Sequence, residues 1–178
     1  MTASRSDATA WCLTGAGHFL EESIELALRC GQVSFFLSRA AVEVVAMYRL
    51  MDRITGSGNR VVIEEGYSSP ACGEMALGRF SRLVIAPATS NTVAKCALGI
   101  ADTLPTNLFA QTGKALVPTF VLPTDGSDKA VSRDPAGRSF PVTTRNIDRR
   151  NLDTLASFEQ VAVASSMEQL EQWLHIFS

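Results

Sequence analysis

Short apolar runs alternate with segments of helical periodicity about six times along this chain of 178 residues. An apolar run of roughly four to eight residues predicts a buried strand, and apolar residues spaced three and four apart predict a helix buried on one side. Regular alternation of the two is typical of a doubly wound α/β fold, in which a parallel sheet carries helices on both faces. The sequence therefore predicts this fold class, with right-handed crossovers between strands.

The expected elements form one domain over residues 11–178, preceded by a polar, disordered tail over residues 1–10. Strands are expected at 11–14, 33–37, 61–63, 83–86, 118–122 and 161–164. Helices are expected at 18–30, 38–51, 73–80, 104–114, 152–158 and 167–176. Residues 124–138 are expected to form a loop or lid, and residues 139–147 an extended piece.

One stretch joins a buried strand to a polar turn and the start of a helix. The apolar run Leu83–Ala86 ends at Pro87, and small and hydroxyl residues follow over Ala88–Thr92 before helical periodicity resumes. Open parallel sheets bind ligands at the carboxyl ends of their strands. The turn offers hydroxyls, an amide and unpaired helix N–H groups, which suit a flat heteroaromatic ligand with polar edges or a phosphate.

Two further turns lie at the same edge of such a sheet. Gly15-Ala16-Gly17 follows the first strand, and Ser38-Arg39 follows the second. The short glycine motif by itself is compatible with phosphate binding or with a plain tight turn. Ser38 can cap its helix and also bind an anion, and Arg39 can assist it or extend into solvent. Topology therefore predicts a single site lined by three turns.

Charge and cysteine usage argue against several other classes of protein. The formal net charge of −2 at pH 7 argues against a nucleic-acid-binding surface. The four cysteines show no CxxC spacing, so we expect core thiols in a reducing cytosol and no metal site. We find no apolar segment long enough for a signal peptide or a membrane span, so the expected location is cytoplasmic, away from membranes.

The turn sequences resemble those of the homo-oligomeric flavin-containing cysteine decarboxylase family over about residues 11–125. The matching segments are Ala86–Thr92 with Lys95, Gly99–Leu104, Thr14–Gly17 and Ser38–Ala41. The resemblance implies FMN as cofactor, bound near a subunit interface in a trimer or a multiple of trimers. The residues that it assigns to FMN are Gly15, Ala16, Gly17, Ser38, Arg39, Ala88, Thr89, Ser90, Asn91, Thr92, Asp102 and Thr103. Of these, the first loop and Ser38 are expected to hold the phosphate, and Ala88–Thr92 to line the ring.

Two departures from the decarboxylase pattern concern its chemistry. The family carries a His-Ile-x-Leu segment before the strand that leads to the Asn-Thr loop, and the matching histidine is Glu74 here. The family also carries a Pro-x-Met-Asn substrate clamp, and the matching segment here reads Pro123-Thr124-Asp125-Gly126. Without the base and the clamp, decarboxylation of a peptidyl cysteine is disfavoured.

Within the wider family the chain resembles the archaeal-type flavoproteins that include dihydromethanopterin reductase. The segments that carry this resemblance are residues 14–19, 73–79, 122–125 and 145–151. Some members contain an added cysteine cluster for iron and sulfur, which this sequence lacks, so FMN is the expected cofactor on its own. The resemblance implies an FMN-dependent oxidoreductase that reduces a pterin, most readily dihydromethanopterin to its tetrahydro form, with electrons from a separate donor.

Two alternatives remain open from the sequence: an FMN electron-transfer protein without turnover of its own, and a decarboxylase with a replaced base. Four residues are candidates for contact with the substrate: His18, Tyr67, Glu74 and Asp125. The carboxylates of Glu74 and Asp125 can pair with the guanidine-like edge of a pterin. Alternatively, Glu74 is simply an acid at the start of a helix, and Asp125 a solvated loop residue. His18 can cap or donate to the phosphate, and Tyr67 can stack on substrate or cover the sheet end.

Overall fold

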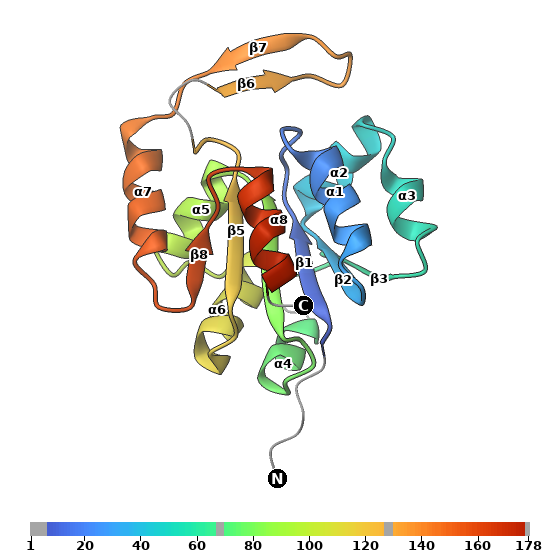
Figure 1. The fold of residues 1–178 in the computed structure, drawn as a ribbon, viewed down its shortest axis with the longest axis vertical. Helices are drawn as coiled ribbons and strands as arrows, with labels where there is room; N and C mark the ends of the chain where they lie inside the picture. The colour runs from blue at the N-terminus through green and yellow to red at the C-terminus, as the bar shows by residue number, and fades with distance from the viewer. Residues whose placement is uncertain (1–6, 67–69, 127–129, 177–178) are drawn as a thin grey trace.

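The computed structural model describes residues 7–66, 70–126 and 130–176. Six parallel strands form one sheet in the order β3-β2-β1-β4-β5-β8 (Figure 1). The strands are β1 (Thr9–Leu13), β2 (Val33–Leu37), β3 (Arg60–Ile63), β4 (Arg82–Ala88), β5 (Thr119–Pro123) and β8 (Val161–Val163). This order reverses direction between β1 and β4, as in a doubly wound fold, and confirms the predicted fold class.

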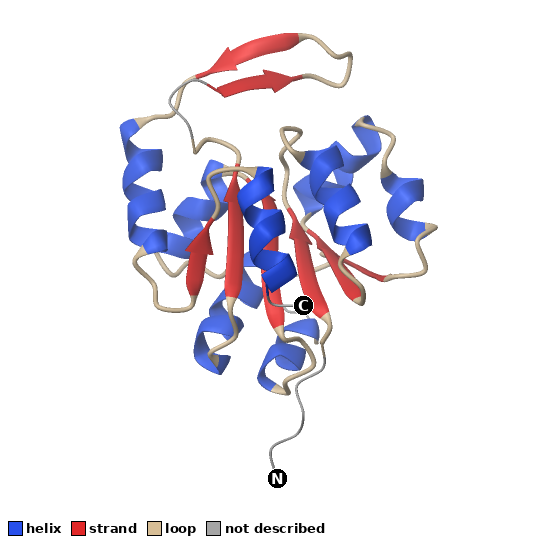
Figure 2. Cartoon of the chain, in the orientation of Figure 1, coloured by secondary structure: helices blue, strands red, loops and turns tan. Residues whose placement is uncertain are grey.

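Helices cover both faces of the sheet (Figure 2). They are α1 (Leu20–Arg29), α2 (Arg39–Met47), α3 (Met51–Thr55), α4 (Ala71–Ala76), α5 (Ser90–Ala97), α6 (Leu104–Ala115), α7 (Asn146–Ala156) and α8 (Met167–Ile176). None of these helices, within the residues just given, has both the length and the hydropathy that a membrane crossing requires. The predicted segment 38–51 is divided into α2 and α3 by a left-handed residue, Arg49, at φ 57°.

Two hydrophobic cores lie on opposite faces of the sheet because successive strand residues alternate in direction. Trp11 and Leu13 belong to the core under α1, α2, α3 and α8, whereas Ala10 and Cys12 belong to the core under α4, α5, α6 and α7. All four side chains are fully buried. Each strand is therefore apolar on both sides, which explains the continuous apolar runs in the sequence.

An antiparallel hairpin stands beyond the carboxyl ends of the sheet (Figure 1). It pairs β6 (Ala130–Arg133) with β7 (Ser139–Val142). The prediction of a loop over 124–138 was wrong for β6, because its short mixed sequence shows no strand alternation. The extended piece predicted from residue 139 is confirmed as β7.

Two predicted boundaries are corrected. β1 begins at Thr9, so residues 9 and 10 belong to the sheet and not to a tail, and residues 1–6 lie outside the described part of the chain. The helix predicted at 152–158 begins at Asn146 instead. Its first turn is polar and is held by the Asp148 carboxylate, which accepts from the backbone N–H of Arg145 at 3.2 Å and from its Nε at 2.8 Å.

Candidate functional site

The turns after β1 and β4 are joined through one buried hydroxyl. The Oγ1 of Thr14 donates to the carbonyl oxygen of Pro87 at 2.7 Å and accepts from the backbone N–H of Thr89 at 3.0 Å. Thr89 in turn caps α5, because its Oγ1 accepts from the N–H of Thr92 at 3.2 Å. The junction lies where the strand order reverses, which is the place where doubly wound sheets bind ligands.

A crevice of two lobes surrounds this junction. The basic lobe, of about 380 Å³, is lined by Gly15, Ser38, Arg39, Ala40, Glu64, Thr89, Asn91, Thr92, Lys95 and Thr103. The hairpin lobe, of about 330 Å³, is lined by Gly15, Ala16, Gly17, His18, Thr89, Ser90, Asn91, Thr124, Asp125, Ser132 and Val142. The lobes share Gly15, Thr89 and Asn91, so the three predicted turns do form one site at one edge of the sheet.

Close packing explains the first two glycines. A Cβ on Gly15 would lie 2.6 Å from the Cβ of Ala40, and a Cβ on Gly17 would lie 2.7 Å from Cζ of Tyr48. Real Cβ atoms do not approach other atoms so closely, so a larger residue at Gly15 would push the β1 turn away from the start of α2, whereas one at Gly17 would require the Tyr48 ring, at the C-terminal end of α2, to move. Gly15 thus keeps the turn backbone against the start of α2, at a position that both lobes share.

The basic lobe combines helix N–H groups with two cations. Ser38 caps α2 by accepting from the N–H of Ala41 at 3.1 Å, and the first N–H groups of a helix lack intrahelical acceptors. The guanidinium of Arg39 donates to the Glu65 carbonyl at 3.0 Å, and its backbone N–H donates to the Glu64 carboxylate at 3.2 Å. An acidic group thus already lies at the N-terminus of α2, where the helix dipole favours negative charge.

The second cation of this lobe, Lys95, pairs with Asp102 at 2.8 Å. Asp102 lines neither lobe and contacts the site through this ion pair with Lys95. Thr103, also assigned to the cofactor by sequence, does line this lobe, and its backbone N–H donates to Oγ1 of Thr106 at 3.0 Å.

The hairpin lobe holds an acidic group and an imidazole. The Oγ of Ser90 donates to Oδ2 of Asp125, and the side chain of His18 packs on Phe19 with ring centroids 3.8 Å apart. Burial lowers the pKa of His18 below its usual value, while the negative charges of Glu22 and Asp125 act in the opposite direction. His18 is therefore held mainly as neutral imidazole near neutral pH.

Among the described residues, three predicted site residues line neither lobe: Glu74, Ala88 and Asp102. Glu74 lies on α4, at the end of the sheet opposite the hairpin, and forms a bidentate ion pair with Arg60 at 2.6 and 2.9 Å (Figure 1). This pair holds the pKa of the Glu74 carboxyl below its usual value. Ala88 is fully buried in β4 and acts through its carbonyl, which accepts from the Thr124 N–H at 3.0 Å. Tyr67 lies outside the described residues.

Sequence reasoning gave no site role to six residues that line the crevice: Ala40, Glu64, Lys95, Thr124, Ser132 and Val142. Glu64 directly follows β3, and its position after a predicted strand was a usable signal. Ser132 and Val142 come from the hairpin, whose placement over the sheet edge is a long-range feature without a local pattern.

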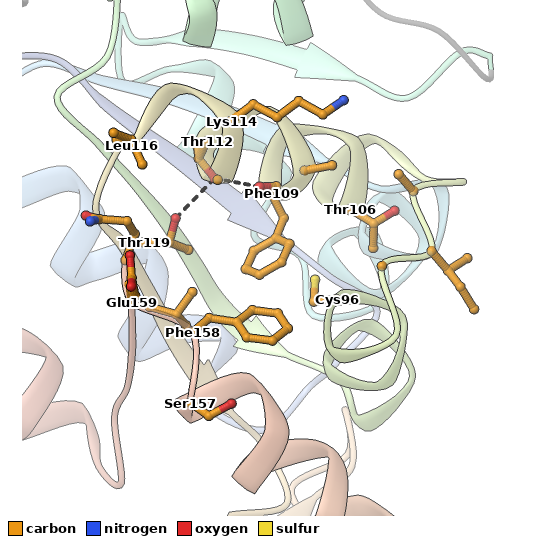
Figure 3. Close-up of a pocket in the computed structure, with 17 residues that line it drawn as sticks. Cys96, Thr106, Phe109, Thr112, Lys114, Leu116, Thr119, Ser157, Phe158 and Glu159 are labelled. Carbon is orange, nitrogen blue, oxygen red and sulfur yellow. Dashed lines mark hydrogen bonds between the residues drawn. The ribbon is translucent and has the colours of Figure 1, made fainter.

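A larger cavity, of about 580 Å³, lies at the amino ends of β5 and β8 (Figure 3). Phe109 and Phe158 face each other across it with ring centroids 6.4 Å apart, and Thr119 donates to Thr112 at 3.2 Å on its wall. Its lining is mostly apolar, and the three turns lie at the other end of the strands. Although this cavity is larger than either lobe, it lies away from the three turns and is not the candidate site.

The cysteines show no reactive environment. None of the four forms a disulfide, Cys12 and Cys96 are buried, and burial raises the pKa of Cys96 to about 12. Such thiols remain protonated and behave as small apolar groups. Among the described residues no group of His, Cys, Asp or Glu is arranged to hold a metal ion.

Residues 2–174 match the model of the protein family that is described as Flavoprotein. The chain belongs to this flavoprotein family. The chain is also similar to solved structures over nearly its whole length. Burkholderia xenovorans DmrB, solved in complex with FMN and described as a cubic protein cage for redox transfer, is 38% identical with a TM-score of 0.89. The match covers 98% of this flavoprotein and 96% of DmrB.

A curated relative of this flavoprotein is the dihydromethanopterin reductase (acceptor) of Methanosarcina mazei, 42% identical over 154 residues. The match covers 79% of this chain and 61% of the relative, so the chain spans about three-fifths of that protein's length. The FMN-dependent cysteine decarboxylase TvaF from thioviridamide biosynthesis shares the fold alone, with 22% identity, a TM-score of 0.64 and 96% of each chain covered.

Proposed function

We propose that this flavoprotein binds FMN in the two-lobed crevice and uses it to reduce a pterin of the dihydromethanopterin type. The observation that carries the proposal is the crevice at the β1/β4 junction, where three turns place hydroxyls, an amide, two cations and helix N–H groups around one ligand site. The likeness to DmrB with FMN and to a dihydromethanopterin reductase supports both the cofactor and the substrate.

The residues present fit the parts of FMN. The basic lobe suits the phosphate, because the N-terminus of α2, Arg39 and Lys95 offer donors and positive charge. The shared Asn91 offers an amide that can donate to or accept from the carbonyl edge of the ring. When bound, the flavin supplies the hydride chemistry, and the protein supplies position and electrostatics.

This chain's own groups define the surroundings of the reaction. Gly15 and Gly17 place turn backbone along the wall of the crevice, and Ser132 and Val142 of the hairpin line its far side. Glu74, which replaces the decarboxylase histidine in the sequence, is ion-paired with Arg60 at the other end of the sheet. A reductase is therefore favoured over a decarboxylase that would use Glu74 as its base.

We also propose self-association as a trimer or a multiple of trimers, with the crevice near a subunit boundary. The hairpin supports this proposal, since an isolated pair of strands is marginally stable in water and Val131 and Phe140 are 58% and 45% exposed. DmrB, described as a cubic cage, is an assembled relative. Light scattering that gave a monomer with bound flavin would overturn this part.

The experiment that tests the function is an anaerobic titration. The purified protein is loaded with FMN, bleached with a chemical reductant and then mixed with 7,8-dihydropterin or dihydromethanopterin. Return of the oxidised flavin spectrum, with one tetrahydropterin formed for each flavin, supports the proposal. A flavin that binds but stays reduced with pterins indicates an electron-transfer protein instead, and release of carbon dioxide from a cysteinyl peptide indicates a decarboxylase.

A further inference from the structure

Asp125 is fixed in the hairpin lobe by contacts on both sides. The Thr124 N–H before it donates to the carbonyl of Ala88 at 3.0 Å, and its own carbonyl accepts from Oγ1 of Thr144 at 2.9 Å. Its side chain accepts from the hydroxyl of Ser90 through Oδ2. Backbone and carboxylate are therefore both held in place before any ligand arrives, which lowers the ordering cost of binding.

The carboxylate of Asp125 is an acceptor group with more capacity than Ser90 uses. An ionised carboxylate has two oxygens and about four acceptor positions, and it donates nothing. Asp125 is half-buried and lines the cavity, so the remaining positions are presented to whatever occupies the hairpin lobe. A partner for it must offer N–H or O–H groups, and two adjacent donors match its two oxygens best.

The ring edges of a flavin and of a pterin differ in this respect. The pyrimidine edge of a flavin places one N–H between two carbonyl oxygens, and those oxygens would face a carboxylate unfavourably. The 2-amino-4-oxopyrimidine of a pterin places an amino N–H beside the ring N3–H, which forms a fork of two parallel donors. Asp125 therefore complements the pterin and opposes the flavin edge.

We propose that Asp125 binds the 2-amino and N3–H edge of the pterin substrate, with Ser90 as its positioning residue. This inference rests on the proposed function, because it assigns a specificity group within the same crevice. It also divides the crevice: FMN is held from the basic lobe, and the substrate's pyrimidine is held by Asp125, in the turn after β5, beside the hairpin residues Ser132 and Val142.

The test compares two probes on the protein loaded with oxidised FMN, so that no turnover occurs. One probe is 7,8-dihydropterin, and the other is 7,8-dihydrolumazine, in which a 2-oxo group replaces the 2-amino group. We expect the wild type to prefer the pterin by about 10- to 100-fold in dissociation constant, because a site built for two donors rejects an analogue with one.

Asp125→Asn should abolish that preference. Its amide can donate to the 2-oxo group, so pterin binding should weaken by about tenfold or more while lumazine binding is kept or improved. Ser90→Ala should weaken the pterin alone by a smaller factor, and Asp153→Asn, an exposed acid of α7, is the matched control that should change neither. Melting temperature and bound FMN are measured for each variant to confirm folding.

The outcomes separate this inference from the proposed function. Pterin binding by the wild type with no preference over lumazine overturns the role of Asp125, whatever the variants do. Equal weakening of both probes in Asp125→Asn, or loss of FMN from it, also overturns that role and leaves pterin reduction standing. FMN-loaded wild type that binds neither probe contradicts the pterin substrate itself.

Discussion

The hydroxyl of Thr14 lies 2.7 Å from the carbonyl oxygen of Pro87 and is fully buried between the turns after β1 and β4. The hydroxyl oxygen of Thr14 also accepts a hydrogen bond from the backbone N–H of Thr89, the residue that caps α5. One side chain therefore sets the distance between the two turns that both lobes share. Neither turn has another side-chain hydrogen bond of this kind to the other among the described residues.

Thr14→Val should destabilise the protein and weaken flavin binding together. Valine keeps the shape but leaves the Pro87 carbonyl and the Thr89 N–H unpaired, at a cost of about 2–4 kcal/mol in the free energy of unfolding. Thr14→Ser should retain most of both properties. Thr119→Val removes another buried hydroxyl at the opposite end of the sheet, so it should lower the melting temperature without changing flavin affinity. Equal flavin affinity in Thr14→Val and Thr119→Val would contradict the role of Thr14.

Lys95 and Glu64 should affect the phosphate of FMN in opposite directions. Both side chains line the basic lobe, so Lys95→Met removes an attraction and Glu64→Gln removes a repulsion. We expect FMN affinity to fall by about tenfold in the first variant and to rise in the second, by an amount that added salt reduces. Riboflavin, which lacks the phosphate, is the control ligand and should bind both variants equally. Fluorescence titration measures all four affinities, and a parallel change for riboflavin would place the phosphate elsewhere.

Asn91→Asp should weaken FMN by about tenfold without unfolding the chain. Asn91 lines both lobes, so the change places a negative charge beside the phosphate and the carbonyl edge of the ring. Asn59→Asp introduces the same charge in the loop before β3, at the amino end of the sheet. Unchanged flavin occupancy in Asn91→Asp would show that Asn91 does not contact the ligand.

The location of the site was predictable because it follows from topology. Continuous apolar runs indicated parallel strands, and the polar turns after the first, second and fourth strands had to meet at one edge. The turn sequences alone would have been ambiguous, since Gly15 and Ser38 also serve packing and capping, as the approach of Ala40 to Gly15 demonstrates. The parallel sheet brings the three turns to one edge, and this shared position indicates a binding site that no single turn motif indicates.

The parts that failed leave no apolar periodicity in their own segments. Glu74 was a plausible substrate group until Arg60, fourteen positions earlier, was seen to take both of its oxygens. The start of α7 was missed because Asp148 and Asn151 are buried polar residues, so no apolar face marks that turn. β6 was missed because its partner strand, and not its own pattern, stabilises it.

Glu74→Gln should lower stability and leave ligand binding unchanged. The Arg60 partnership keeps the folded pKa of Glu74 below its unfolded value, so its stabilising effect is present at neutral pH and is lost as the pH falls through that range. Because Arg60 is nearly half exposed, the loss should be about 1 kcal/mol or less. Arg60→Met should produce a similar loss in chemical denaturation. A clear fall in pterin affinity for Glu74→Gln alone would indicate that a neighbouring subunit brings Glu74 to the substrate.

His18 should make the folded protein less stable as the pH falls below the usual histidine value of 6.5. Burial lowers its pKa in the folded state, so the unfolded chain binds more protons in that range and the free energy of unfolding decreases with falling pH. His18→Gln should reduce this slope, as measured by denaturation at several pH values. The chain has two histidines, so His175→Gln assigns both imidazole resonances in an NMR titration. Asp125 opposes the effect of burial, so Asp125→Asn should lower the pKa of His18 further, and an unchanged pKa would show that the two groups do not interact.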